Sequence, residues 1–432
     1  MPISPYASLV IDAERRRKRV PSQSIAALRE SLSIDDNVQR LLRTYAPWAQ
    51  ELEAVNDHIT VRYNEIDEAI TAYEEVAQHL RKQLDWPEEA THVFPQGSAS
   101  TRTLIRSPIA NEKFDIDAVC QVDINHIDAY NPIDFFDKVG EALRRYEPKR
   151  KNRCWNINFA SNPFYLELTP SVPLDTVPIN IRASITETLR PVENYRDTAL
   201  AVVDNDTQQW KTSNPAGISR WVNDIAKRQL LSQQAFVALT SLRETASVES
   251  VPDQDVDITD TLRISIRLFK RHRDICARRG RIDKEVQPIS IILVTLLTSC
   301  YAGLHDLGRP YQHPVELLVD LSELLPGMTE FRNGKHWVAN PTVEGENFAE
   351  KWNQDDGVRS TAFKTWCDIL AADLRTILAT TDPKEIRETV GDVFGITGST
   401  NPSTGLFASA GLIGTPATRR PPPPPPKTRG LA

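Results

Sequence analysis

The spacing of apolar residues changes twice along this 432-residue chain and so limits what it can fold into. From Asp35 to Leu84, apolar residues recur at steps of three and four, which predicts two helices broken near Pro47. The helical spacing stops at Asp85-Trp86-Pro87, because the residue before proline disfavours helix. Strands are then expected at 91–94, 114–123 and 155–169. Helices are expected again at 216–245, 256–278, 288–303, 314–325 and 357–379.

These segments predict an α+β protein with a mixed sheet-and-helix unit followed by an all-helical unit. The basic run from Arg15 to Arg19 is typical of a solvated arm. The last stretch is rich in Gly, Ser, Thr and Pro and includes six consecutive prolines, so it cannot bury enough apolar surface to order itself. We expect a flexible N-terminal arm at 1–33, a mixed unit at 34–215, a helical unit at 216–396 and a disordered proline-rich tail at 397–432.

The composition argues against several classes of partner. A net charge of -7 disfavours a stable complex with long duplex nucleic acid. Five cysteines without any CxxC pair are typical of a reduced compartment. The most apolar run, Ile289 to Leu297, is too short to span a bilayer. We therefore expect a cytoplasmic protein with no membrane partner.

Two carboxylates lie two residues apart in the expected strand 114–123. Side chains at that spacing point to the same face of a strand, so Asp115 and Asp117 would lie side by side. They would repel each other in a half-buried strand unless a cation lay between them, and hard oxygen ligands suit Mg²⁺ or Mn²⁺. The pattern predicts a metal site, although an isolated Asp-x-Asp is often only a solvated strand face.

A third acid and a glycine turn complete this pattern. Glu167 is the single acid in the apolar run 164–170 and would complete a site for two metal ions, although it could instead pair with a buried arginine. Gly97-Ser98 suits a triphosphate, because glycine lets the backbone approach closely and the serine hydroxyl can donate to phosphate; a plain turn is the alternative. The ordered combination is more specific than any of its parts.

In this combination the chain resembles the cGAS/DncV-like nucleotidyltransferases of the DNA polymerase β superfamily. Further matching segments are Ser213-Asn214-Pro215-Ala216-Gly217 with Trp221, Leu268 to Asp274, Pro288-Ile289-Ser290, and Asn340-Pro341 with Glu346-Asn347-Phe348. The resemblance covers roughly residues 35–395. It departs from the family pattern at Glu167, where aspartate is more usual, and in a longer gap between Ser98 and Asp115.

The resemblance implies a bilobal enzyme. A polymerase-β-like palm, braced by a long N-terminal helix, would pack on a helical lobe like that of oligoadenylate synthases. Asp115, Asp117 and Glu167 would be the catalytic metal ligands, and Lys270 and Ser290 would contact the donor triphosphate together with Gly97 and Ser98. The alternatives are a solvated helix residue for Lys270 and a helix N-cap for Ser290.

The implied activity is condensation of nucleoside triphosphates into a cyclic di- or trinucleotide second messenger for anti-phage defence, read by a downstream effector. Linear oligoadenylate synthesis, extension of an RNA end, and a catalytically dead nucleotide sensor are the alternatives. Some relatives are conjugated at the C-terminus by ubiquitin-transfer-like accessory proteins, so Ala432 is a candidate attachment residue.

Overall fold

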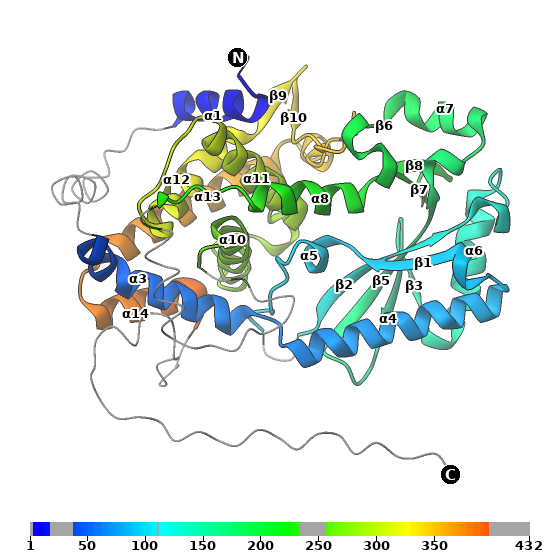
Figure 1. Ribbon diagram of the computed structural model, residues 1–432, viewed down its shortest axis with the longest axis horizontal. Coiled ribbons are helices and arrows are strands. Elements are labelled where there is room, and N and C mark those ends of the chain that lie inside the picture. The colour runs from blue at the N-terminus through cyan, green and yellow to red at the C-terminus, as the bar shows by residue number, and fades with distance from the viewer. Residues whose placement is uncertain are drawn as a thin grey trace, which may run out of the picture.

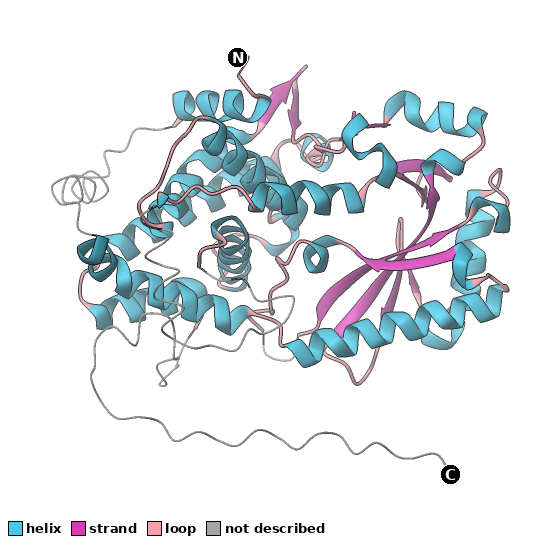
Figure 2. Ribbon diagram, in the orientation of Figure 1, coloured by secondary structure: helices cyan, strands magenta, loops and turns pink. Residues whose placement is uncertain are grey.

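The structure has a sheet-rich half and a helical half (Figures 1 and 2). It is a computed structural model that describes residues 3–17, 38–109, 112–233, 235, 256 and 258–396. The predicted α+β class is confirmed. The predicted tail at 397–432, with Ala432, and residues 18–33 of the predicted arm lie outside the described residues.

One mixed sheet organises the first half. Its strands run in the order β1-β2-β5-β4-β3, with β7 joined to β5 and β8 joined to β7. The strands are β1 Thr91–Pro95, β2 Phe114–Val122, β3 Lys149–Arg150, β4 Trp155–Asn158, β5 Phe164–Pro173, β7 Leu200–Asp204 and β8 Gln209–Ser213. Only the pairing of β2 with β5 is parallel among these strands.

Helices cover this sheet on the side that buries its apolar residues. They are α4 Tyr63–Leu84 and α6 Pro132–Ala142, while the short α5 Gly97–Ser100 follows β1 and α7 Ile179–Thr188 follows β5. Side chains of α4 and α6, such as Val76 and Phe136, share a buried cluster with Ile116 of β2 and Leu166 of β5. Figure 1 shows α4 running along the full width of the sheet.

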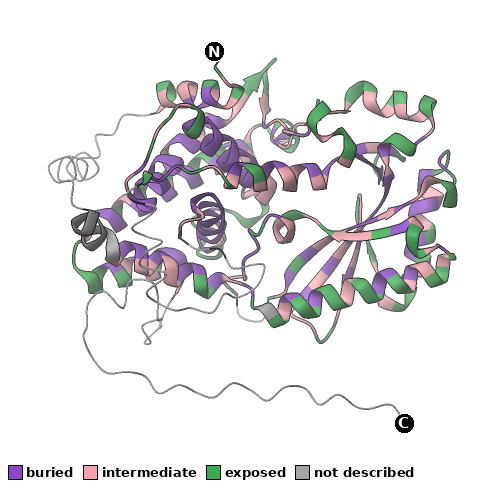
Figure 3. Ribbon diagram, in the orientation of Figure 1, coloured by how far each residue is buried: buried purple, intermediate pink, exposed green. Residues whose placement is uncertain are grey.

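The second half is a bundle around one helix that is buried along nearly its whole length. Its helices are α1 Pro5–Arg16, α3 Val38–Ile59, α8 Pro215–Ala226, α10 Thr261–Arg278, α11 Ser290–Asp306, α12 Pro314–Leu324, α13 Val358–Ala379 and α14 Pro383–Phe394. Short strands β9 Glu330–Arg332 and β10 Lys335–Trp337 form a hairpin, and β11 Val343–Glu344 pairs with β6 Arg190–Pro191 of the first half. Figure 3 shows α10 as the buried centre.

The long N-terminal helix is divided between the two halves, and the predicted break at Pro47 is wrong. Pro47 lies inside α3, which continues because Trp48 and Leu52 pack into the helical core. The break comes instead at Thr60–Arg62, where the Arg62 amide donates to the Glu65 carboxylate at 3.0 Å and starts α4. The boundary at 34 therefore misassigns α3, because α3 packs with the helical half and α4 packs on the sheet.

The predicted flexible arm is also wrong for residues 5–16. These residues form α1, whose small side chains Ala7, Val10 and Ala13 are buried. The helix lies directly on α11, since a β-carbon at Gly303 would come within 2.4 Å of the Tyr6 carbonyl oxygen. The basic run misled the prediction because the three small residues that anchor this helix give only a weak apolar pattern.

The segment expected as one strand at 155–169 forms two. β4 and β5 are antiparallel partners joined through residues 159–163, and Asn156 lies opposite Glu167. The residues Ser161-Asn162-Pro163 favour a turn, so the chain reverses there. Within the described residues, no helix is both long and apolar enough to cross a bilayer.

Candidate active site

Parallel pairing of β2 and β5 brings the three predicted acids together. Asp117 lies opposite Glu167, and Asp115 lies opposite Tyr165. These four side chains share one face of the sheet because residues two apart on a strand point the same way. Asp117 and Glu167 are half-buried, Asp115 is exposed, and the intervening Ile116 and Leu166 point into the core.

The carboxylates carry an electrostatic cost in the absence of a cation. Burial, the Asp115 carboxylate and then the Glu167 carboxylate raise the pKa of Asp117 to about 7, against an ordinary value of 3.8. Burial and the same acids also raise the pKa of the Tyr165 hydroxyl. A divalent cation would relieve this repulsion, and oxygen donors from three carboxylates fit Mg²⁺ or Mn²⁺.

The Gly97-Ser98 turn lies directly against this cluster. Gly97 begins α5 with a φ of +63°, and a β-carbon there would come within 2.3 Å of Oδ2 of Asp117. The neighbouring Gln96 amide donates to the Asp117 carbonyl at 2.8 Å, which continues the pairing of β1 with β2. Only glycine therefore fits at position 97, for both its conformation and its contact.

Lys270 reaches the same region from the helical half. It lies on α10 with its ammonium group donating to the carbonyl oxygen of Thr103 at 2.9 Å. Burial and then the nearby Arg273 lower the pKa of Lys270 to about 8, whereas Asp115 acts in the opposite direction. The alternative of a solvated helix residue is wrong, since Lys270 is buried within electrostatic reach of the carboxylates.

Ser290 is the first residue of α11, and the N-cap position belongs to Ile289, so the N-cap alternative is wrong. Its hydroxyl oxygen accepts a hydrogen bond from Nη1 of Arg273 at 3.1 Å. Arg273 also donates to the Pro288 carbonyl at 3.0 Å and is itself buried. Lys270 and Ser290 therefore share Arg273 as a neighbour, a residue that the sequence did not single out.

Two further residues contact the third acid, Asn156 on β4 and Cys154 directly before that strand. Nδ2 of Asn156 donates to Oε1 of Glu167 at 3.4 Å, and the Cys154 thiol donates to Oε2 at 3.5 Å. Burial and then Glu167 raise the pKa of that thiol, so it stays protonated as a donor. Neither residue stands out in the sequence, although the turn at Ser161-Asn162-Pro163 indicates that β4 folds back onto β5.

A separate group of possible metal ligands lies inside the helical core. His272, Cys276 and Asp373 lie together there. Both ring nitrogens of His272 already have partners: Nδ1 accepts from the Trp366 indole at 3.0 Å, and Nε2 lies 3.0 Å from the Asp373 carboxylate. This group therefore joins α10 to α13 as part of the core packing.

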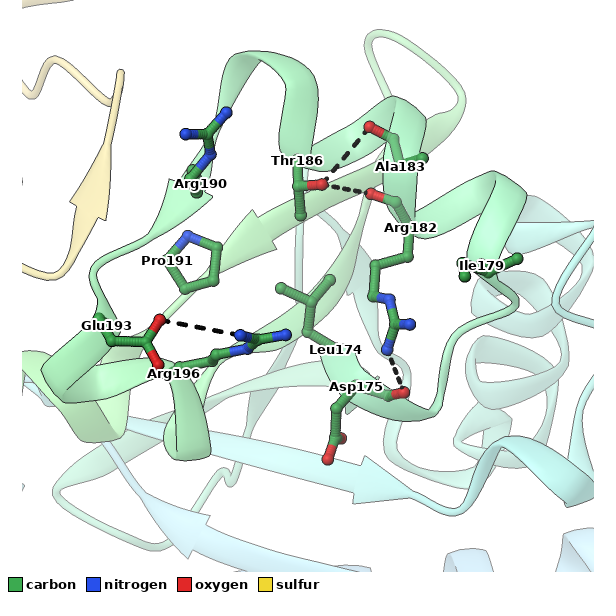
Figure 4. A pocket seen from close by; sticks show the side chains of 10 residues that line it. All are labelled: Leu174, Asp175, Ile179, Arg182, Ala183, Thr186, Arg190, Pro191, Glu193 and Arg196. Carbon is green, nitrogen blue, oxygen red and sulfur yellow. Dashed lines mark hydrogen bonds and ion pairs between the residues drawn. The ribbon is translucent and has the colours of Figure 1, made fainter.

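A cavity of about 320 Å³ opens beyond the C-terminal end of β5, away from the carboxylates. Figure 4 shows Leu174 in the middle of the lining side chains, with Arg182, Arg190 and Arg196 around it. Arg182 donates to the Asp175 carbonyl at 2.6 Å, and Arg196 pairs with Glu193 at 3.7 Å. Two of its three arginines are thus held by groups of the cavity itself.

Comparison with known proteins gives one family. Residues 48–190 match the Second Messenger Oligonucleotide or Dinucleotide Synthetase domain. Over 291 residues the chain is 27% identical to a c-di-GMP synthase of Roseivirga ehrenbergii, covering 65% of this chain and 67% of that protein. The fold is similar to that of the Bradyrhizobium diazoefficiens CD-NTase CdnG in complex with GTP, with a TM-score of 0.54, 18% identity, and 81% and 97% of the two chains covered.

A second solved structure, CdnC of E. coli MS115-1 with ATP, matches with a TM-score of 0.51 and 12% identity over 82% of this chain and 98% of that one. At these identities the two structures show a shared fold. The domain match spans the segment that carries Gly97, the Asp115 and Asp117 pair, and Glu167. Residues 48–190 therefore match a second-messenger synthetase domain that contains the three acids, and the fold of the chain is similar to that of solved CD-NTases.

Proposed function

We propose that this chain condenses nucleoside triphosphates into a cyclic di- or trinucleotide second messenger, in defence against bacteriophage. The observation that carries the proposal is the cluster of Asp115, Asp117 and Glu167 beside the Gly97 turn, with buried Lys270 across the seam. The match to a family of second-messenger synthetases supports this class of product. A downstream effector would bind the product.

The three carboxylates would hold two divalent cations, Mg²⁺ or Mn²⁺. When bound, such a pair activates an attacking hydroxyl and neutralises charge on the departing pyrophosphate. The chain contributes a fixed array of oxygens, because Asp117 and Glu167 are opposite each other on hydrogen-bonded strands. Asn156 on β4 and the thiol of Cys154, directly before β4, would orient the Glu167 carboxylate.

The donor triphosphate would lie between the turn and α10. The Gly97 and Ser98 amides and the Ser98 hydroxyl would donate to phosphate oxygens, and the Lys270 ammonium would act as a point charge. Ser290, already bonded to Arg273, would add a hydroxyl at the same edge. Each condensation would form one phosphodiester bond at the α-phosphorus, break the bond to the β-phosphate and release one pyrophosphate.

The test is a product assay with all four ribonucleoside triphosphates and Mg²⁺ or Mn²⁺. Phosphatase-resistant products would be resolved by mass spectrometry for the wild type, the Asp115→Ala/Asp117→Ala variant and a Glu141→Gln control, since Glu141 is an exposed acid on α6. We expect a cyclic di- or trinucleotide from the wild type and the control only. A linear ladder would instead support oligoadenylate synthesis or extension of an RNA end, and nucleotide binding without any product would support a sensor.

A role for the C-terminus stays a prediction, because Ala432 lies outside the described residues. A proline-spaced tail with a small last residue would suit attachment by ubiquitin-transfer-like accessory proteins. Deleting the last residues in cells that carry the accessory genes should abolish the conjugate while the product assay in vitro is unchanged. A conjugate that persists would remove the idea.

A further inference from the structure

Four basic residues of α10 are buried at the seam between the two halves. Arg263, Arg267, Lys270 and Arg271 follow one another at steps of four, three and one, so they lie on one side of the helix. Each is at most 6% exposed. Burying a charged side chain costs free energy unless hydrogen bonds compensate for the lost water, so the groups that these four residues bind show what their burial maintains.

These side chains bind consecutive stretches of backbone in the loop that follows α5. Each side chain donates to one backbone carbonyl, and we call these four hydrogen bonds the carbonyl ladder. Nε of Arg263 donates to Thr101 O and Nζ of Lys270 to Thr103 O, both at 2.9 Å. Nη2 of Arg267 donates to Leu104 O at 3.3 Å, and Nη1 of Arg271 donates to Arg106 O at 3.4 Å. The loop has no regular secondary structure of its own between 103 and 107. Its path is therefore set by a helix of the other half.

The same loop holds the Gly97-Ser98 turn. The Thr101 amide and hydroxyl donate to the Gly97 carbonyl at 3.3 and 3.1 Å, and the Thr103 amide donates to the Ser98 carbonyl at 2.9 Å. Gly97 in turn lies against the Asp117 carboxylate. A continuous series of hydrogen bonds thus connects α10 to the turn beside the carboxylates.

Arg263 has the most direct position in this series. Besides Thr101, it donates to Oδ1 of Asn223 on α8 at 2.8 Å, and Nδ2 of Asn223 donates to the Ser100 carbonyl at 3.4 Å. The Ser100 hydroxyl also contacts the Ser219 hydroxyl of α8 at 2.6 Å. The Arg263 guanidinium therefore holds Thr101 directly and Ser100 through Asn223, and Ser219 of α8 contacts Ser100 as well.

We propose that Arg263 and Arg267 are positioning residues that set the Gly97-Ser98 turn against Asp117. The phosphate-binding turn of the palm is then completed by docking of the helical lobe, and neither arginine touches a substrate. This inference rests on the proposed function for the identity of the ligand. Its structural part, the dependence of the turn on α10, is independent of turnover.

The test compares Arg263→Gln with Arg263→Lys, and uses Arg375→Gln as the control. Arg375 pairs with Glu323 within the helical half, with Nε to Oε1 at 3.1 Å. Hydrogen–deuterium exchange would be followed in the peptide 97–106, together with Mn²⁺-dependent binding of a nonhydrolysable ATP or GTP analogue and the melting temperature. A second variant, Arg267→Lys, covers the case in which Arg263→Gln does not fold.

In Arg263→Gln we expect faster exchange in 97–106 and about tenfold weaker analogue binding. Loss of one hydrogen bond from a charged group changes an equilibrium constant by about tenfold. Arg263→Lys should recover part of both, because lysine keeps the charge without the planar fork. The control should lower the melting temperature alone. If exchange and analogue binding are both unchanged in the folded Arg263 and Arg267 variants, the proposal is wrong, and the carbonyl ladder only stabilises the fold. A wild type that binds no analogue would count against the proposed function, while the exchange result would still decide the role of α10.

Discussion

The backbone of Gly97 lies so close to the Asp117 carboxylate that a β-carbon at position 97 would come within 2.3 Å of Oδ2. This contact connects the end of β1 with the centre of β2, and it joins the turn proposed for phosphate binding to a carboxylate proposed for metal binding. A change at either residue is therefore expected to alter both functions.

Gly97→Ala should abolish most activity, because the new methyl group displaces either the turn or the Asp117 carboxylate. We expect a loss of roughly 100-fold in kcat/KM, the size that follows from a misplacement of about 1 Å. Steady-state kinetics with saturating Mn²⁺ would measure it. The matched control is Gly308→Ala, which has a similar φ of +64° and no atom within 4 Å of the added carbon. Equal losses in both variants would contradict a specific role for the Gly97 contact.

The pKa of Asp117 predicts how metal affinity changes with pH. Because this pKa is about 7 in the metal-free protein, a cation must displace a proton at lower pH. Apparent Mn²⁺ affinity should therefore fall by about tenfold for each pH unit below 7. Electron paramagnetic resonance of free Mn²⁺ would measure this dependence. An affinity that is constant between about pH 5.5 and 7 would contradict the assignment.

The same group predicts a pH dependence of stability in the metal-free protein. The folded-state pKa of about 7 lies above the ordinary value of 3.8, so the folded protein binds this proton more tightly than the unfolded chain. The stabilising contribution is thus complete at low pH and is lost as the pH rises through 7. Asp117→Asn removes the titrating group. The melting temperature of the wild type should therefore fall relative to that of the variant as the pH rises toward and through 7. A difference that is independent of pH would argue against the raised pKa.

Asn156→Ala should weaken Mn²⁺ binding, because the Glu167 carboxylate loses the hydrogen bond that orients it. Partners that hydrogen-bond to a metal ligand typically affect affinity by about 10-fold to 100-fold, and the long 3.4 Å bond places the expectation at the lower end. The control is Asn158→Ala on the same strand, whose side chain accepts from Lys113 at 2.8 Å instead. Titration with Mn²⁺ would separate them, and equal affinities in the two variants would exclude a positioning role for Asn156.

The three acids were predictable because local rules determine where they lie. The strand period puts Asp115 and Asp117 on one face, and Glu167 stands out as the single acid of an apolar run. The parallel pairing of β2 and β5 then brings Glu167 opposite Asp117. The division into a mixed and a helical half followed from the same spacing rules.

What could not be predicted depends on contacts between segments far apart in the sequence. Arg263 and Arg267 look like solvated helix residues in the sequence, but both are buried against the loop after α5, where they bond backbone carbonyls. Arg267 also donates to Oδ1 of Asn56 at 2.8 Å. Pro47 was expected to end a helix, yet packing of Trp48 into the helical core keeps α3 continuous. Neither effect leaves a local pattern, because each depends on a partner from the other half or from a distant helix.

The proposed metal site is tested most directly by locating Mn²⁺ through its anomalous scattering in crystals grown with a nonhydrolysable nucleoside triphosphate. We expect Mn²⁺ bound by Asp115, Asp117 and Glu167, with the triphosphate reaching the Gly97-Ser98 turn. Mn²⁺ bound only at His272, Cys276 and Asp373, or a triphosphate seated away from the three acids, would contradict this proposal.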